Sequence, residues 1–368
     1  MNIHGSIKQS IYLIYKFSAA IMMRFLVCLL SASHSKQNDM MGWAVARGIQ
    51  GKAEICCDDM AGGGRGLIAT QDCAPGEVVL RVPLSATLRL EGDCCATENE
   101  DDNWAGTLAS KLMGEKKLGS SSHFETYLEN GLPDEAPLTP CRWTSTERLA
   151  LQNYTFVEES RLNAEWRTRQ VLRNQPSNVV EYLKMLDLVC SRTLKGRSGS
   201  RQLVPVMDIA NHAPSETGGG HFQVVENDAV YLIAGSRGVN AGEPVLMDYG
   251  GRSVDDFLMH YGFVPDRCLS DCVLVPIEAG HRTISWNDCQ GYNGHPEAGV
   301  RQACEDLLMT FPTTLEEDVA LLNELPLDTS EATRNALQYR YAKKSLLASV
   351  VGMQSSSARR SAFSFNHV

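Results

Sequence analysis

The side chains best suited to chemistry gather in residues 203–212, which read Leu-Val-Pro-Val-Met-Asp-Ile-Ala-Asn-His. An apolar run that we expect to form a strand over residues 203–207 leads directly into Asp208, Asn211 and His212. Each of these polar groups needs a partner once it leaves water, and an asparagine amide offers both donors and an acceptor. The pattern fits a ligand-binding turn, and an ordinary polar turn with a helix cap is the alternative.

A second stretch, residues 243–263, contains a tyrosine at the end of an apolar run. Tyr249 follows a short apolar run and precedes Gly250 and Gly251, and glycines let a ligand backbone come close. The stretch ends in Tyr261-Gly262-Phe263. These aromatic rings could line a channel, or they could simply pack in the core.

A third stretch, residues 62–70, begins with a run of glycines. Gly63, Gly64 and Gly66 surround Arg65, so the backbone here can approach a ligand closely. By itself a Gly-x-Gly is an ordinary turn.

In the order in which they occur along the chain, the three motifs Gly64-Arg65-Gly66, Asn211-His212 and Tyr249-Gly250 resemble those of the SET-domain protein methyltransferases. The resemblance is greatest to the branch that includes the Rubisco large-subunit lysine methyltransferase and the actin-histidine methyltransferase. It extends over roughly residues 40–350.

The resemblance implies S-adenosylmethionine as cofactor and a protein lysine as acceptor, with no metal. It makes Tyr249 the catalytic residue, and the Arg192 side chain a partner for the cofactor carboxylate. Arg192 could equally complement the dipole of the helix it ends. We expect Asp208 mainly to fix its turn. The cofactor-binding residues implied are Gly63, Gly64, Arg65, Gly66, Arg192, Asp208, Asn211, His212, Tyr261, Gly262 and Phe263.

Methyl transfer makes modest demands on a protein. The amine, the methyl group and the sulfonium must be aligned, and the lysine must be uncharged, which an apolar channel favours through desolvation. Actin-directed relatives have a tryptophan and an asparagine where this chain has Met207 and Leu194, so the resemblance favours lysine over histidine. A catalytically silent SET-fold binding module is the alternative from another class.

Composition limits the possible partners. The 368 residues carry a net charge of −10, which excludes general attraction to nucleic acid and favours a basic protein partner. The twelve cysteines include no Cys-x-x-Cys and no following His pair, so we interpret them as reduced core residues, with a zinc-stabilised scaffold as the lesser alternative. We expect a monomer, with no membrane association in the mature form.

Residues 1–38 differ from the rest of the chain. They contain Lys8, Lys16, Arg24 and Lys36 and no acidic residue, and they are rich in serine. This composition is typical of an organelle transit peptide and indicates a plastid (chloroplast) protein; a disordered tail on a cytoplasmic protein is the alternative.

We predict an α+β fold, with a mainly antiparallel SET core that contains a pseudoknot, a helical insert and an all-helical C-terminal substrate-binding domain. Residues 67–70 and 78–82 should pair as a hairpin, as should 223–226 and 230–234. Helices should cover residues 39–48, 104–113, 123–128, 147–153, 157–172, 179–194, 253–260, 297–311, 314–324 and 330 onward, and a strand residues 273–277. Ser253 should cap one of these helices, Thr314 and Glu317 should form a capping box on another, and an apolar stripe that begins at Ala336 should be the buried face of the last. The predicted divisions are 1–38 (targeting segment or tail), 39–90 and 200–277 (SET core), 91–199 (insert), 278–354 (substrate-binding domain) and 355–368 (tail).

Overall fold

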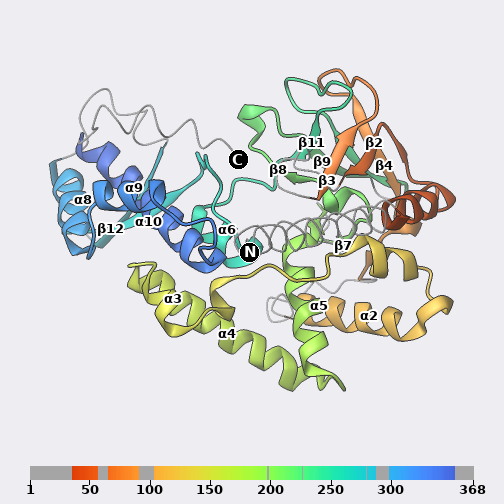
Figure 1. Cartoon of the computed structure of the whole chain (residues 1–368), viewed down its shortest axis with the longest axis horizontal. Helices are drawn as coiled ribbons and strands as arrows, with labels where there is room; N and C mark the ends of the chain where they lie inside the picture. The colour runs from red at the N-terminus through yellow and green to blue at the C-terminus, as the bar shows by residue number, and fades with distance from the viewer. Residues whose placement is uncertain are drawn as a thin grey trace, which may run out of the picture. The chain divides into compact units, whose positions relative to one another are not determined.

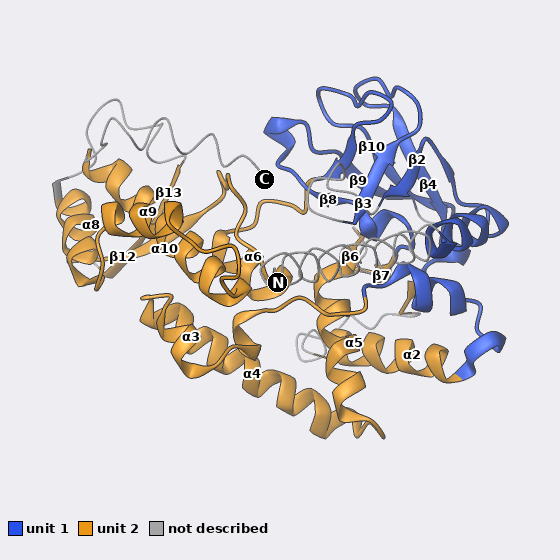
Figure 2. Ribbon diagram, in the orientation of Figure 1, with its two compact units in different colours: residues 1–87, 118–133, 204–247 blue, residues 88–117, 134–203, 248–368 orange. Residues whose placement is uncertain are grey.

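The computed structural model describes residues 35–56, 65–90, 103–196, 199–225, 227–278, 280–286 and 298–352. The chain forms two compact units (Figure 2). Unit 1 comprises residues 1–87, 118–133 and 204–247, and unit 2 comprises residues 88–117, 134–203 and 248–368. The predicted tail, 355–368, and most of the predicted targeting segment lie outside the described residues.

Unit 1 is built on two four-stranded sheets, with the orders β1-β4-β10-β9 and β2-β3-β11-β8. All pairings are antiparallel except that of β8 with β11. The strands are β1 (Gln50–Gly51), β2 (Ala53–Cys56), β3 (Gly66–Ala69), β4 (Val78–Pro83), β8 (Asn211–His212), β9 (His221–Val225), β10 (Ala229–Ile233) and β11 (Pro244–Met247). A helix over residues 35–46 precedes them, close to the predicted one.

The two hairpins predicted from the sequence have different outcomes. β9 and β10 pair as predicted, across a turn in which Asn227 has a φ of +60°. The predicted hairpin of β3 with β4 is wrong, because the two strands lie in different sheets. Residues 50–56, for which no strand was predicted, supply the partners: β1 pairs with β4, and β2 pairs with β3.

The predicted strand over residues 203–207 is also wrong. Strand β7 (Arg201–Leu203) stops where that prediction starts, and residues 207–209 form a 3-10 turn. Pro205 has no N–H to donate to a sheet, and Val206 has φ +70°. A positive φ is a strained conformation for a β-branched residue, and strain of this kind concentrates at functional sites.

Unit 2 is mainly helical (Figure 1). Its first part contains α2 (Trp104–Leu118), α3 (Ser145–Leu149), α4 (Tyr154–Asn174), α5 (Val179–Arg192) and α6 (Val254–Tyr261). The helix predicted over residues 123–128 is only partly confirmed. That segment belongs to unit 1, and a π-helical turn there covers Tyr127–Gly131. A small sheet of order β5-β7-β6 adds β5 (Leu88–Arg89) and β6 (Leu194–Lys195) to β7.

The C-terminal part of unit 2 combines a β-hairpin with three helices. The hairpin is β12 (Cys272–Ile277) with β13 (Gly280–Ser285), of which only the first strand was predicted. The helices are α8 (Ala298–Thr310), α9 (Leu315–Asn323) and α10 (Glu331–Val351), which confirms the predicted helical end of the chain. Thr314 and Glu317 form the predicted capping box at the start of α9, satisfying backbone N–H groups that the helix leaves unpaired.

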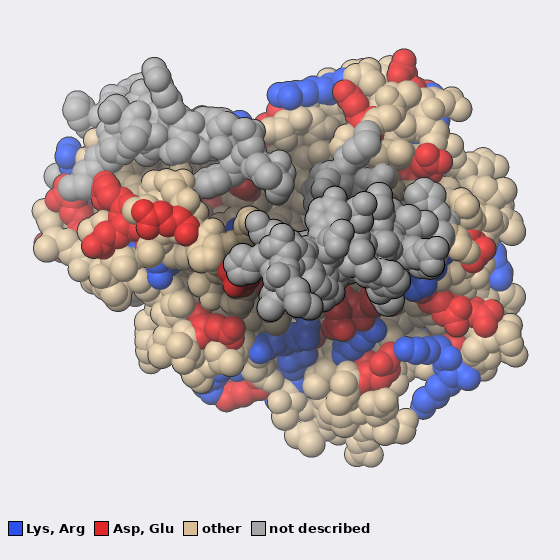
Figure 3. Space-filling model, viewed as in Figure 1, with Lys and Arg blue, Asp and Glu red and all other residues tan. Residues whose placement is uncertain are grey.

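The helices α8 and α9 present an acidic surface. On the face drawn in Figure 3, Asp and Glu side chains gather over this part of unit 2. The exposed acidic residues of this part are Asp306, Glu316, Glu317, Glu324 and Asp328. None of the helices in the described ranges is both long and apolar enough to cross a bilayer.

Candidate active site

Unit 1 brings the Asn-His pair beside the end of the glycine-rich segment. The Asn211 side-chain amide donates to the Arg65 carbonyl at 3.3 Å, across 146 residues of sequence. Asn211 and His212 form β8, which pairs in parallel with Leu246 and Met247 of β11. The His212 ring nitrogen Nδ1 lies 3.3 Å from the Met247 carbonyl. The structure therefore joins two of the three sequence motifs within one sheet, since Arg65 directly precedes β3 and Asn211 begins β8.

The Arg65 side chain points to other partners. Its guanidinium donates to the Gly131 carbonyl at 2.6 Å and to the Leu132 carbonyl at 3.5 Å. A ligand at this position would therefore meet the Arg65 backbone. Gly63 and Gly64 lie outside the described residues, and Gly66 begins β3.

Asp208 is held by a tyrosine that the sequence did not single out. The Tyr127 hydroxyl donates to the Asp208 carboxylate, and both side chains are buried. The Tyr127 ring stacks on Trp43 of the N-terminal helix, with ring centroids 6.4 Å apart. Tyr127 thus holds the Asp208 side chain in the 3-10 turn before Asn211, and the role of Asp208 in fixing that turn stays a prediction.

Unit 2 brings together the aromatic residues that follow the Tyr249-Gly250 motif. Tyr249 stacks on Tyr261, with centroids 5.0 Å apart and ring planes 30° apart. Phe257 packs against Tyr261 at 5.8 Å and against Phe263 at 5.4 Å. Phe257 was not predicted, although its position four residues before Tyr261 on a helix was a usable signal. We call Tyr249, Phe257, Tyr261 and Phe263 the aromatic cluster.

Arg252 links the two tyrosines of the aromatic cluster. Its Nε donates to the Tyr249 carbonyl at 3.1 Å, and its guanidinium lies 5.4 Å from the centre of the Tyr261 ring. Burial raises the pKa of Tyr261, and the positive charge of Arg252 only partly opposes this rise. The Tyr261 phenol is therefore neutral at physiological pH.

Two glycines make the backbone around the aromatic cluster possible. Gly250 has φ +99°, and Gly262 has φ +76° as the C-cap of α6. A side chain at Gly262 would also lie 3.2 Å from the backbone of Leu138. Gly262 therefore has a structural reason to be glycine, since left-handed backbone strains other residues.

Arg192 is the last residue of α5, which ends two residues before the predicted boundary at Leu194, and its side chain is half-buried. Helix α5 packs against α6, the helix that ends at Tyr261. The Thr193 hydroxyl, next in the chain, bonds back to the Val189 carbonyl at 2.7 Å and closes the helix end. The structure thus places Arg192 at the end of a helix next to the one that bears Tyr261.

The cysteines within the described ranges are free thiols, and Cys73, Cys141 and Cys304 are buried. The described parts of the chain contain no group of three or more His, Cys, Asp or Glu side chains placed to hold a metal ion.

The fold is that of the SET domain of LSMT. The structure of that domain bound to lysine and AdoHcy matches with a TM-score of 0.66 at 16% identity, covering 87% of this chain and 91% of that one. Rubisco LSMT bound to AdoMet matches with a TM-score of 0.64 at 16% identity, over 86% and 91% of the two chains. Rubisco LSMT bound to sinefungin and monomethyllysine matches with a TM-score of 0.62 at 17% identity, with the same coverage.

The C-terminal helices match a known family model. Residues 298–347 match the family model described as Rubisco LSMT substrate-binding. This range takes in α8, α9 and most of α10. No curated protein matches the chain. The chain is thus a SET-fold protein with an LSMT-type substrate-binding domain, which confirms the predicted α+β architecture.

Proposed function

We propose that this protein is an S-adenosylmethionine-dependent methyltransferase that methylates a lysine side chain of a non-histone protein. The observation that carries the proposal is the contact of Asn211 with the Arg65 backbone within a SET fold. Two of the motifs that the resemblance assigns to cofactor binding thereby meet, although they are far apart in the sequence. The proposal gains support from the LSMT-type substrate-binding domain at residues 298–347.

The residues that the resemblance assigns to the cofactor suit its polar end. The Arg65 backbone and the Asn211 amide supply donors and acceptors suited to an amino acid group, since the Arg65 side chain is held by other carbonyls. Arg192 offers a guanidinium for a carboxylate, and the two can pair through parallel hydrogen bonds. His212 binds through its backbone and has no proton to transfer in this scheme.

Tyr249 is the proposed catalytic residue. When bound, S-adenosylmethionine supplies the electrophilic methyl group, so the protein need only orient the amine and favour its neutral form. The stacked Tyr261 ring and neighbouring Phe257 and Phe263 form apolar walls, which disfavour an ammonium by desolvation. The Tyr249 oxygen can then receive a hydrogen bond from the amine and contact the methyl group as it moves.

Lysine is the acceptor favoured by the residues of this chain. Met207 and Leu194, at the positions of the histidine-directed side chains, are both buried apolar residues and offer no polar recognition of an imidazole. The acidic surface of α8 and α9 suits a basic segment of the protein substrate. We further propose that the mature protein is a plastid monomer.

Calorimetry with S-adenosylhomocysteine and S-adenosylmethionine tests the proposal. A methyltransferase should bind both at one site, and each should compete with the other without added metal. A folded protein that gives no binding heat with either compound would return the chain to the silent-module alternative.

A further inference from the structure

Helix α10 presents three polar side chains at intervals of four residues, namely Asn335, Tyr339 and Lys343. Residues spaced by four lie on one face of a helix. All three are buried, with exposed fractions of 5%, 0% and 2%. Buried polar groups are costly unless they are bonded, so their partners show what this stripe does.

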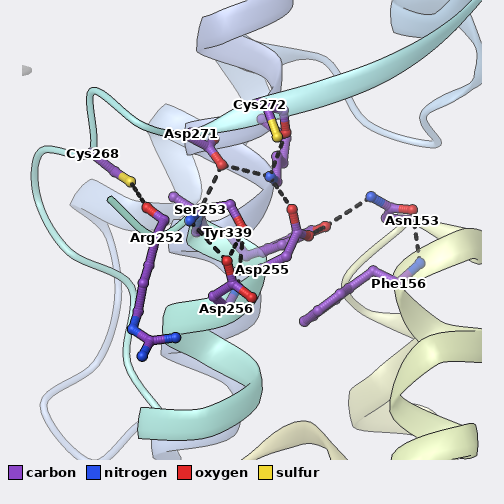
Figure 4. Close-up of polar contacts among 12 residues, drawn as sticks. Asn153, Phe156, Arg252, Ser253, Asp255, Asp256, Cys268, Asp271, Cys272 and Tyr339 are labelled. Atoms are coloured by element: carbon purple, nitrogen blue, oxygen red, sulfur yellow. Dashed lines mark hydrogen bonds and ion pairs between the residues drawn. The ribbon is translucent and has the colours of Figure 1, made fainter. Parts of the chain in front are cut away.

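The stripe contacts both ends of α6, and Figure 4 shows the contact of Tyr339 with Asp255 at the N-terminal end. At the C-terminal end, the Asn335 amide donates to the Gly262 carbonyl at 2.7 Å. At the N-terminal end, the Tyr339 hydroxyl donates to Asp255 at 2.6 Å, and Lys343 pairs with the same carboxylate. One helix of the substrate-binding domain thus grips α6 at its beginning and at its end.

A second carboxylate strengthens the N-terminal grip. Lys343 Nζ lies 2.7 Å from Asp271 Oδ1, and the same oxygen accepts from the backbone N–H of Val254, the first residue of α6, at 2.9 Å. Burial lowers the pKa of Lys343, but the attraction of Asp271 and Asp255 outweighs this and leaves the pKa raised. Lys343 is therefore charged, and its ammonium group binds both Asp255 and Asp271.

Helix α6 carries two of the four residues of the aromatic cluster. It contains Phe257 and ends at Tyr261, whose ring lies on Tyr249. A rotation or shift of α6 would move the Tyr261 ring relative to Tyr249. Buried ion networks often add little net stability compared with apolar packing, and one recognised use of them is to specify a single arrangement.

We propose that Asn335, Tyr339 and Lys343 are positioning residues, through which the substrate-binding domain sets the placement of the aromatic cluster for methyl transfer. This inference rests on the proposed function for its chemistry. None of the three need touch the cofactor or the substrate, because each acts through α6.

The test compares Lys343→Met with Lys344→Met. Lys344 is the next residue of the same helix, is fully buried and is bonded to Asp318 at 2.6 Å and to the Thr313 carbonyl at 2.6 Å, both at the α9 end of the domain. Each variant removes one buried cation and leaves one or more buried carboxylates. A merely structural role would therefore give similar results for both.

Two readouts separate positioning from stability. Hydrogen exchange, followed by mass spectrometry, reports on the α6 amides. Methyl transfer from labelled S-adenosylmethionine at saturating concentration, to proteins extracted from cells that lack this chain, reports on turnover. We expect Lys343→Met to speed α6 exchange and to lower the transfer rate about tenfold or more, on the scale of small misplacements in catalytic sites. Lys344→Met should leave both within about twofold of the wild type.

Tyr339→Phe decides the matter if Lys343→Met does not fold, because it removes only one oxygen. The variant loses the hydrogen bond to Asp255 and also the one that the hydroxyl accepts from the Asn153 amide at 2.8 Å. It should speed α6 exchange and lower the saturated rate by about threefold to tenfold, the scale of the one bond that reaches α6. Equal effects of Lys343→Met and Lys344→Met, or a Tyr339→Phe variant identical to the wild type, would overturn the inference. If the wild-type protein transfers no methyl group, the proposed function is rejected instead. Hydrogen exchange would still show whether the three residues hold α6 in place.

Discussion

Asn211 is the single residue whose contacts most directly support cofactor binding. Replacement by alanine removes an amide that bonds the Arg65 carbonyl and that we expect to bond the cofactor. We predict a loss of about 1–3 kcal/mol in cofactor binding free energy, the scale of leaving a buried polar partner unmet. Calorimetry on a variant with unchanged circular dichroism measures it, and an unchanged affinity would make Asn211 a structural residue.

Tyr249 can be tested by removing one oxygen atom. Tyr249→Phe keeps the ring that stacks on Tyr261 at 5.0 Å, so the aromatic cluster should persist. If the phenol acts mainly as transfer proceeds, turnover should fall by about 10²-fold while the affinity for S-adenosylhomocysteine stays the same.

Single-turnover transfer to hypomethylated extract, with affinity measured in parallel, makes this comparison. The matched control is Tyr231→Phe, which removes a phenol oxygen from strand β10 in unit 1. A Tyr249→Phe variant that methylates at the wild-type rate would leave Tyr249 as a packing residue.

A buried bidentate ion pair joins helices α4 and α5 of unit 2. Arg167 of α4 donates to both oxygens of Asp187 on α5, at 2.9 and 2.7 Å. Burial raises the pKa of Asp187 even though Arg167 lowers it, so the carboxylate depends on its partner. This pair supports the helix that ends at Arg192.

We predict that Arg167→Met lowers the free energy of unfolding by about 3–5 kcal/mol, because it leaves a buried carboxylate unpaired. Urea denaturation measures the change. Arg161→Met provides the control on the same helix, since Arg161 pairs with Glu158 and Glu165 at the surface and its loss should barely move the midpoint. Equal midpoints for the two variants would contradict this account of α4 and α5.

Local signals in the sequence predicted most single elements and the β9–β10 hairpin, but not the pairing of strands that are far apart in the sequence. Ser253 and Thr314 cap α6 and α9 as expected, and the apolar stripe that begins at Ala336 is the buried face of α10. Caps and stripes depend on neighbours within one or two turns, which a sequence displays. The separation of β3 from β4 depends on competition from residues 50–56, which no local pattern reveals.

The same limit applies to the candidate site. The motifs named Arg65, Asn211, Tyr249 and Tyr261, yet nothing in their spacing predicts that Asn211 bonds the Arg65 carbonyl. Tyr127 escaped notice because its role depends on a contact with Asp208 across 81 residues. The strain at Val206 was equally invisible, since valine is a residue that normally favours strands.

The protein as a whole should lose stability in alkaline solution. Burial raises the pKa of Tyr182 to about 12, and burial together with Asp255 raises that of Tyr339 well above the usual value. The folded state keeps these phenol protons, whereas the unfolded chain releases them near pH 10, so stability is full below pH 10 and falls as the pH rises above it.

Urea denaturation at a series of pH values from about 8 to 11 measures this loss. Tyr339→Phe should show a shallower loss, because one of the two tyrosines is absent. If tyrosinate absorbance instead develops fully near pH 10 in the folded protein, the burial argument is contradicted.

The basic N-terminal segment makes a prediction about the whole protein in the cell. Residues 1–38 contain four basic and no acidic side chains, and we expect them to direct import into a plastid. A fluorescent reporter fused behind these residues should accumulate in plastids, and a fusion with Lys8, Lys16, Arg24 and Lys36 replaced by glutamate should not. Cytosolic fluorescence from the first fusion would count against the plastid proposal.

The most direct measurement of the central claim is the identity of the methylated amino acid. The purified protein is incubated with methyl-tritiated S-adenosylmethionine and an extract of cells that lack this chain, and the labelled proteins are hydrolysed and separated. The account predicts label in Nε-methylated lysine, lost in the Tyr249→Phe control. Label in methylhistidine would contradict the acceptor that we propose, and no label above an incubation without the protein would contradict the activity itself.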